Sequence, residues 1–220
     1  MLIHANDGFI DFTGFFNADV SAQAGATDPS TVTNAQGGTA RILLEGTSPI
    51  SSRIDFVDIN FNSDGLIDTN LETTVPFEGD GGTGSGGSVI FDLFGGTFVA
   101  GDIVTSASGS GGRGGAIVTL PAPNVAAPFA SAFAAPEDLS VVNAAFAGGV
   151  SAGDGGDGQG GDVTFNLNGG NATVTNLTIS ANGFGGNGAN GDINNGTSGG
   201  SGGRGIGGNA VFNAQTGNLT

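Results

Sequence analysis

The chain has 220 residues, of which 45 are glycine, 7 are proline and none is cysteine. Its 20 acidic side chains outnumber 4 arginines, and the formal net charge of −16 excludes binders of nucleic acid or anionic membrane, which need basic patches. The high glycine content is typical of low complexity, but 37% hydrophobic residues and 16 phenylalanines provide apolar surface for a core. The lack of cysteine excludes disulfides and thiolate metal sites.

The first part of the chain, residues 1–36, is predicted to be a strand or cap region. Its start lacks the charged and apolar regions of a signal peptide, which predicts a mature chain or a segment of something longer. The apolar cluster of this region has two possible roles: it caps the structure, or it docks on a neighbouring molecule and completes an open repeat there. The predicted assembly residues are Phe9, Phe12, Phe15, Phe16 and, at the other end, Leu219.

A candidate calcium loop follows, over residues 60–72. Asn60, Asn62, Asp64 and Asp68 place oxygen ligands at loop positions 1, 3, 5 and 9, and a glycine stands at position 6. The acid expected at position 12 is missing, although Glu72 comes one residue later. The alternative is a hairpin between residues 54–59 and 71–75 that turns at Ser63, Asp64 and Gly65.

Repeats organise residues 37–220. The unit is a Gly-Gly pair, a strand, a glycine-containing turn, a second strand and a glycine-rich return. Residues 88–96 align with residues 162–170 at an offset of 74, and a third copy opens near residue 207, with weaker openings at 37–38 and 114–115. Alternating apolar and polar residues predict strands whose apolar side chains share one buried face. The predicted core ladder consists of Phe91, Phe165 and Phe212, flanked by Val163, Leu167 and Ile179.

The glycine-rich returns have a period of three. Gly199, Gly202, Gly205 and Gly208 form one such ladder, and similar ladders occur near residues 81–87, 109–115, 155–161 and 185–191. Three residues per turn is the period of polyproline II, and only glycine lets such backbones pack closely along a shared face. Collagen is excluded because the ladders are short and proline is scarce.

Two further features interrupt or end the repeats. A proline-rich insertion at about 120–137 is predicted to lie at an edge or on the surface, because proline cannot serve in a central strand. The sequence stops at Asn218, Leu219 and Thr220, inside a repeat. Either the chain is a fragment, or its open end is completed by another molecule.

Copies of Gly-Gly-x-Val-x-Phe-x-Leu, a glycine turn and x-Leu-Thr-Ile-Ser-Ala resemble the repeat regions of large filamentous-haemagglutinin-like bacterial surface proteins. That resemblance implies a parallel β-helix exported to the cell surface, with a role in adhesion or biofilm matrix. The glycine ladders depart from a plain β-helix. They resemble the polyglycine II bundles of some phage adhesin tips and insect antifreeze proteins.

Together these patterns predict an all-β fold, a parallel β-solenoid with interleaved polyglycine II segments and little or no helix. The predicted function is a structural segment of an extracellular bacterial fibre or adhesin that self-associates head to tail, with no cofactor and no nucleic-acid partner. One histidine, His4, and the absence of a nucleophile motif argue against an enzyme. The alternatives are a calcium-stabilised adhesin module that binds a glycan and, less favoured, a carbohydrate-active enzyme on a β-helix.

Overall fold

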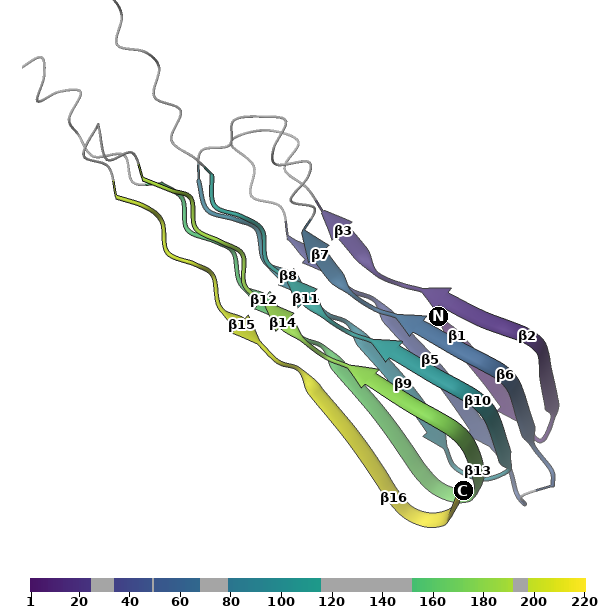
Figure 1. Ribbon diagram of the computed structural model, residues 1–220. Coiled ribbons are helices and arrows are strands. Elements are labelled where there is room, and N and C mark those ends of the chain that lie inside the picture. Colours follow the sequence, from purple (N-terminus) through teal and green to yellow (C-terminus); the bar gives the residue numbers. More distant parts are fainter. Residues whose placement is uncertain (25–33, 49, 68–78, 116–151, 192–197) are drawn as a thin grey trace, which may run out of the picture.

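The computed structural model describes residues 1–24, 34–48, 50–67, 79–115, 152–191 and 198–220. Over these ranges the protein is all-β, with 62% of the residues in strands and no helix. The molecule is elongated, with broad strands at one end and thin extended segments at the other (Figure 1). The proline-rich insertion at about 120–137 lies outside the described residues.

The described chain runs through the molecule in five successive passes. A complete pass enters along an inbound segment, forms a strand in layer one, turns, forms a strand in layer two and leaves along an outbound segment. Layer one contains β1 (Leu2–Asn6), β5 (Thr39–Glu45), β9 (Ser88–Leu93), the first part of β13 (Asp162–Ser180) and β16 (Asn209–Leu219); layer two contains β2 (Phe9–Asp19), β6 (Arg53–Asn62), β10 (Thr97–Ser106) and the second part of β13.

All of these strands pair in parallel in one eight-stranded sheet, in the order β1-β5-β9-β13-β10-β6-β2, and β16 pairs with β13. The sheet crosses between the layers at β13 and is nearly closed, like a barrel. Val163 pairs with Val89 and Leu177 with Ile103, which is the offset of 74 residues at which the sequence repeats align. The pair Gly114–Gly115 lies in an outbound segment, and the residues after it lie outside the described ranges.

The turns between the layers depend on glycine. Gly96 and Gly170 have φ of 76° and 73°, in the left-handed region that L side chains rarely adopt. A Cβ at Gly170 would also overlap the carbonyl oxygen of Gly96 in the preceding pass. Each tight turn therefore stacks directly on the turn before it.

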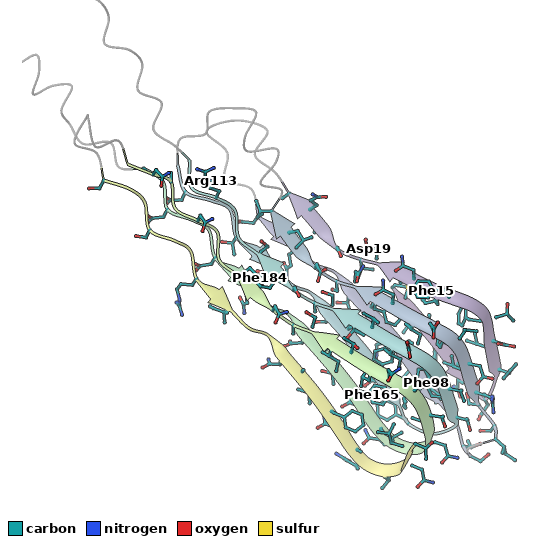
Figure 2. All side chains as sticks on the ribbon, viewed as in Figure 1. Phe15, Asp19, Phe98, Arg113, Phe165 and Phe184 are labelled. Carbon is teal, nitrogen blue, oxygen red and sulfur yellow. The ribbon has the colours of Figure 1, made fainter. Side chains whose placement is uncertain are left out.

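Phenylalanines fill the space between the layers. Phe91 stacks on Phe165 with 5.3 Å between ring centroids, and Phe165 stacks on Phe212 at 5.2 Å. Phe98 of layer two meets Phe91 edge-on at 6.2 Å and Phe165 edge-on at 6.4 Å, so rings of the two layers are in contact. Figure 2 labels Phe98 and Phe165. Such aromatic pairs add about 0.5–1.5 kcal/mol each beyond the burial of their area.

The other end of the molecule is the glycine half, which contains the inbound and outbound segments. Two four-stranded parallel sheets run through it, in the orders β14-β11-β7-β3 and β15-β12-β8-β4. Its outbound segments are residues 20–24, 63–67, 107–115 and 181–191, with β3 (Ala22–Ala24), β7 (Gly65–Ile67), β11 (Gly109–Ser110) and β14 (Gly183–Phe184); its inbound segments are residues 34–38, 79–87, 152–161 and 198–208, with β4 (Ala35–Gln36), β8 (Gly84–Ser85), β12 (Gly158–Gln159) and β15 (Gly205–Ile206).

Backbone packing replaces side-chain packing in the glycine half. The inbound segment 152–161 is hydrogen-bonded to four neighbouring segments, for example from the Gly156 amide to the Gly112 carbonyl at 2.8 Å. A Cβ at Gly156 would overlap the carbonyl oxygen of Gly82 on one side, and a Cβ at Gly155 would overlap that of Gly186 on another. Glycine is therefore required because other backbones occupy the positions where side chains would begin.

Acidic side chains complete the hydrogen bonding at two positions of this inbound segment that are three residues apart. The carboxylate of Asp154 accepts the Ser201 amide at 2.6 Å, and that of Asp157 accepts the Arg204 amide at 2.7 Å. The amide of Asp154 itself donates to the Asp80 carboxylate at 2.9 Å. The side chain thus satisfies an amide on the next inbound segment, a role comparable to that of a helix cap.

Candidate functional site: the open edges of the stack

The last edge of the stack consists of β16, the second part of β13 and the inbound segment 198–208. Strand β16 pairs with β13 on one side, and all of its residues are exposed. Phe212 is 43% exposed although it stacks on Phe165, which is 1% exposed. Within the described part of the chain, the backbone groups on the other side of β16 have no partner strand, and such a row is a template for another strand.

Layer two ends one pass before layer one at this edge. Strand β16 pairs with β13 only as far as Ala172, so among the described residues the rest of β13 has β10 on one side and no strand on the other. The register shows the effect: Ile103 is 1% exposed, whereas its partner Leu177 is 38% exposed. The core is therefore open at this edge.

The first edge, at the opposite end of the stack, consists of β1 and β2 (Figure 1). Phe9 and Phe15 are 62% and 66% exposed, and Figure 2 shows Phe15 at the outside of the strand half. Phe12 and Phe16 instead pack against the protein's own core, and Phe12 stacks on Phe56 at 4.5 Å. The predicted assembly cluster is thus divided between an exposed pair and a pair within the first pass.

The predicted core-ladder residues lie together between the layers except for Phe212, which stacks on Phe165 at the last edge and is exposed. Val163, Phe165 and Leu167 are each 1% exposed, and Ile179 packs against the same core from layer two. Leu219, the fifth predicted assembly residue, is 49% exposed and pairs with Ala172 at the end of β16.

The candidate calcium ligands have other roles where the structure describes them. Asn60 and Asn62 are in β6, and the Asn60 amide group donates to Asn17 at 3.3 Å. The Asp64 carboxylate accepts the Ser106 hydroxyl at 2.6 Å and the Ser108 amide at 2.7 Å. Asp68 and Glu72 lie outside the described residues. Within the described ranges, no group of three or more His, Asp or Glu side chains could hold a metal ion together.

The hairpin alternative for the same residues is wrong. Strand β6 pairs in parallel with β2 on one side and β10 on the other, so neither side is free for residues 71–75. The chain continues past Ser63 into β7, which pairs with β3 and β11 in the outbound sheet.

Ladders of Asp and Asn run along the outside of the sheet, and sequence reasoning missed them. The Asn166 side chain donates to Asp92 at 2.8 Å, and Asn213 donates to Asn166 at 2.9 Å. The Asp92 carboxylate, 6% exposed, also accepts the Arg41 guanidinium at 2.8 Å. In this ladder Asp92 is followed by Asn in the next two passes, which avoids stacking like charges in register. The signal was present in the sequence, because the alignment at offset 74 places Asn166 over Asp92.

Similar pairs involve three asparagines that are each followed two residues later by threonine: Asn171, Asn176 and Asn218. Asn176 donates to Asp102 at 2.7 Å, and Asn218 donates to Asn171 at 3.3 Å. In the structure, the side chains of these asparagines form hydrogen bonds between one pass and the next.

A scan against protein-family models, a search of curated proteins and a search of solved structures each found no match. In the described ranges, no helix is long and apolar enough to cross a membrane. The only histidine, His4, lies at the first edge with its Nε2 atom 2.9 Å from a carboxylate oxygen of Glu45.

Proposed function

We propose that this chain is a structural segment of an extracellular fibre or adhesin, a β-solenoid with an attached polyglycine II bundle, whose copies associate head to tail. The observation that carries this proposal is the pair of open edges at opposite ends of a stack in which every described strand pair is parallel. A contact between unlike edges does not close on itself and therefore propagates as a filament.

The parallel backbone ladders and the acidic charge of the chain support a structural role. Backbone ladders along the stack resist pulling, and each added pass buries the face that the previous one leaves open. The net charge of −16 keeps finished fibres apart in solution. The single His4–Glu45 contact at the first edge offers no nucleophile and no second acid, so a structural role fits the described residues better than catalysis.

The test is electron microscopy of the purified 220-residue chain at neutral pH. Because the Asn209 amide donates to Gly161, the alternation of a parallel ladder turns the Ala210 amide toward the open side. The Ala210→Pro variant removes that donor from the open side and leaves the pairing with β13 in place. We expect filaments from the wild type and from Ala210→Ser, and none from Ala210→Pro.

Circular dichroism and thermal melting of each variant show that it is folded. Dispersed short rods from the wild type at high concentration, or filaments from Ala210→Pro, would overturn head-to-tail assembly through the last edge.

A further inference from the structure

The last inbound segment repeats the glycines of the inbound segment before it. Residues 152–161 and 198–208 are related by the same offset of 47 residues that separates Asn166 from Asn213. In the earlier segment, a Cβ at Gly155 would overlap the carbonyl oxygen of Gly186, and a Cβ at Gly160 would overlap that of Ala181. The outbound segment 181–191 thus requires these glycines, because its backbone lies against them.

The equivalent glycines at the last edge have free space instead. A Cβ at Gly202 would lie 3.8 Å from its nearest neighbour, and a Cβ at Gly207 would lie 3.9 Å away, both ordinary contact distances. Glycine costs about 0.5–1 kcal/mol relative to alanine in regular structure because it loses more conformational freedom on folding. The described fold therefore gives no reason for glycine at either position, although one pass earlier the reason is a backbone packed against it.

An independent observation at the same edge concerns the open core. Phe212 and Leu177 direct apolar surface to the position where a layer-two strand would follow. The Thr220 carbonyl accepts the Val174 amide at 3.0 Å, so the next residue of a covering strand would lie beside the following part of β13. The open core and the two glycines, Gly202 and Gly207, are adjacent at this edge. A layer-two strand would cover the open core, and the outbound segment that follows such a strand would cover the glycines.

We propose that the last edge is a docking site for one kind of partner: an extended segment in which a layer-two strand is followed by glycines that pack backbone to backbone. Residues 174–191 of this chain have that pattern and cover the equivalent surface one pass earlier. The inference goes beyond the proposed function: it concerns the same edge, but it names a glycine-rich segment as the occupant in place of the first pass of a second copy.

The first pass of a second copy fits the glycine part of this site less well. The register of the outbound sheet places Ala22 at the position of Gly65, Gly109 and Gly183. At Gly183, a Cβ would overlap the carbonyl oxygen of Gly158 on the inbound segment of the same pass, and an outbound segment docked beside the last inbound segment would repeat this contact. The steric conflict favours a glycine-rich partner over β3 of another copy.

The experiment titrates a synthetic peptide with the sequence of residues 174–191 into the full 220-residue chain by calorimetry. We expect saturable binding of one peptide per chain. The Gly202→Ala/Gly207→Ala variant folds normally but binds at least about tenfold more weakly, a loss of about 1.4 kcal/mol, because its new methyl groups occupy the space of the partner backbone. Gly14→Ala is the matched control: nothing lies within 4 Å of a Cβ there, and the residue is at the opposite edge.

A second peptide carries Gly183→Val and Gly186→Val and should not bind. If the peptides aggregate, the same residues 174–191 are fused after Thr220. We then expect a higher melting temperature than the wild type, and the Gly202→Ala/Gly207→Ala changes abolish the increase. Absence of peptide binding with no stabilisation by the fusion, or equal binding by the double variant, would overturn the proposal.

Microscopy of the same samples separates this inference from the proposed function. Filaments without peptide binding leave head-to-tail assembly standing and reject the glycine-rich partner. Peptide binding without filaments supports the docking site and rejects self-assembly of this chain.

Discussion

The two halves of each pass solve the same packing problem in different ways. In the strand half, side chains fill the space between the layers, and rings such as those of Phe91 and Phe165 stack from pass to pass. In the glycine half, the backbones themselves are in contact, and the buried side chains are mostly small ones, such as those of Ser63, Ala107 and Ala189. The density of side chains in Figure 2 falls accordingly from one half to the other.

The comparison shows that one parallel register can be maintained by two kinds of interaction. The strand half gains stability from apolar area removed from water, which tolerates substitution by residues of similar size. The glycine half depends on hydrogen bonds in several directions around each segment, and at inward glycines such as Gly155 and Gly156 it has no room for a side chain. The strand half should therefore tolerate exchange between apolar side chains of similar size, whereas the glycine half should not tolerate even a methyl group at its inward glycines.

The largest expected effect is in the strand half. Phe165→Ala removes a fully buried ring that stacks on both neighbours, and it should lower the free energy of unfolding by about 3–5 kcal/mol in urea denaturation. Phe212→Ala is the matched change at the open edge, where the ring is 43% exposed and stacks on one neighbour. It should cost about 1–2 kcal/mol, and equal losses for the two variants would contradict the described order of burial.

The glycine half is tested by the pair Gly155→Ala and Gly202→Ala. At Gly155 the added methyl group overlaps a backbone carbonyl, so we expect a loss of about 1–3 kcal/mol or more. At Gly202 the nearest atom is 3.8 Å from the new Cβ, and stability should be unchanged or about 0.4–1 kcal/mol higher, because alanine restricts the unfolded chain. Thermal melting of both variants makes the comparison, and a large loss at Gly202 would show that the last inbound segment is already covered.

A smaller effect is expected where acidic side chains serve the backbone. Asp154→Ala leaves the Ser201 amide without its acceptor and should lower stability by about 0.5–1.5 kcal/mol. Asp154→Asn keeps an oxygen that can accept the same hydrogen bond and should lose less. If both variants lose equally, the charge of Asp154 matters rather than the hydrogen bond.

The smallest effect concerns pH. The hydroxyl of Ser51 and the amide of Thr47 donate to Asp7 and lower the pKa of its carboxyl below the ordinary value of 3.8; the hydroxyl and amide of Ser21 do the same for Asp19. A lowered pKa in the folded state gives stability that is present above the ordinary pKa and is lost as the pH falls through the lowered one. We expect Asp7→Asn to flatten the fall in melting temperature slightly between about pH 5 and pH 2.5. An unchanged pH profile would show that these exposed contacts add nothing.

Much of the strand half was predictable from the sequence. Alternating apolar residues and the repeat at offset 74 identify Val163, Phe165 and Leu167 as one buried face, because a strand directs every second side chain to the same side. The period of three in the glycines indicates extended segments that pack by backbone contact, because only glycine leaves room for it.

The tertiary structure alone decided which passes are neighbours and what each repeated position faces. Sequence placed Phe9, Phe12, Phe15 and Phe16 in one cluster, but a bulge between Phe12 and Phe15 and the pairing with β6 divide them between solvent and core. Gly155 and Gly202 look alike in sequence, and only the stack shows that one is covered and the other is open. The physical reason is that periodicity fixes what a residue can pack against, whereas its position in the stack fixes whether a neighbour is there.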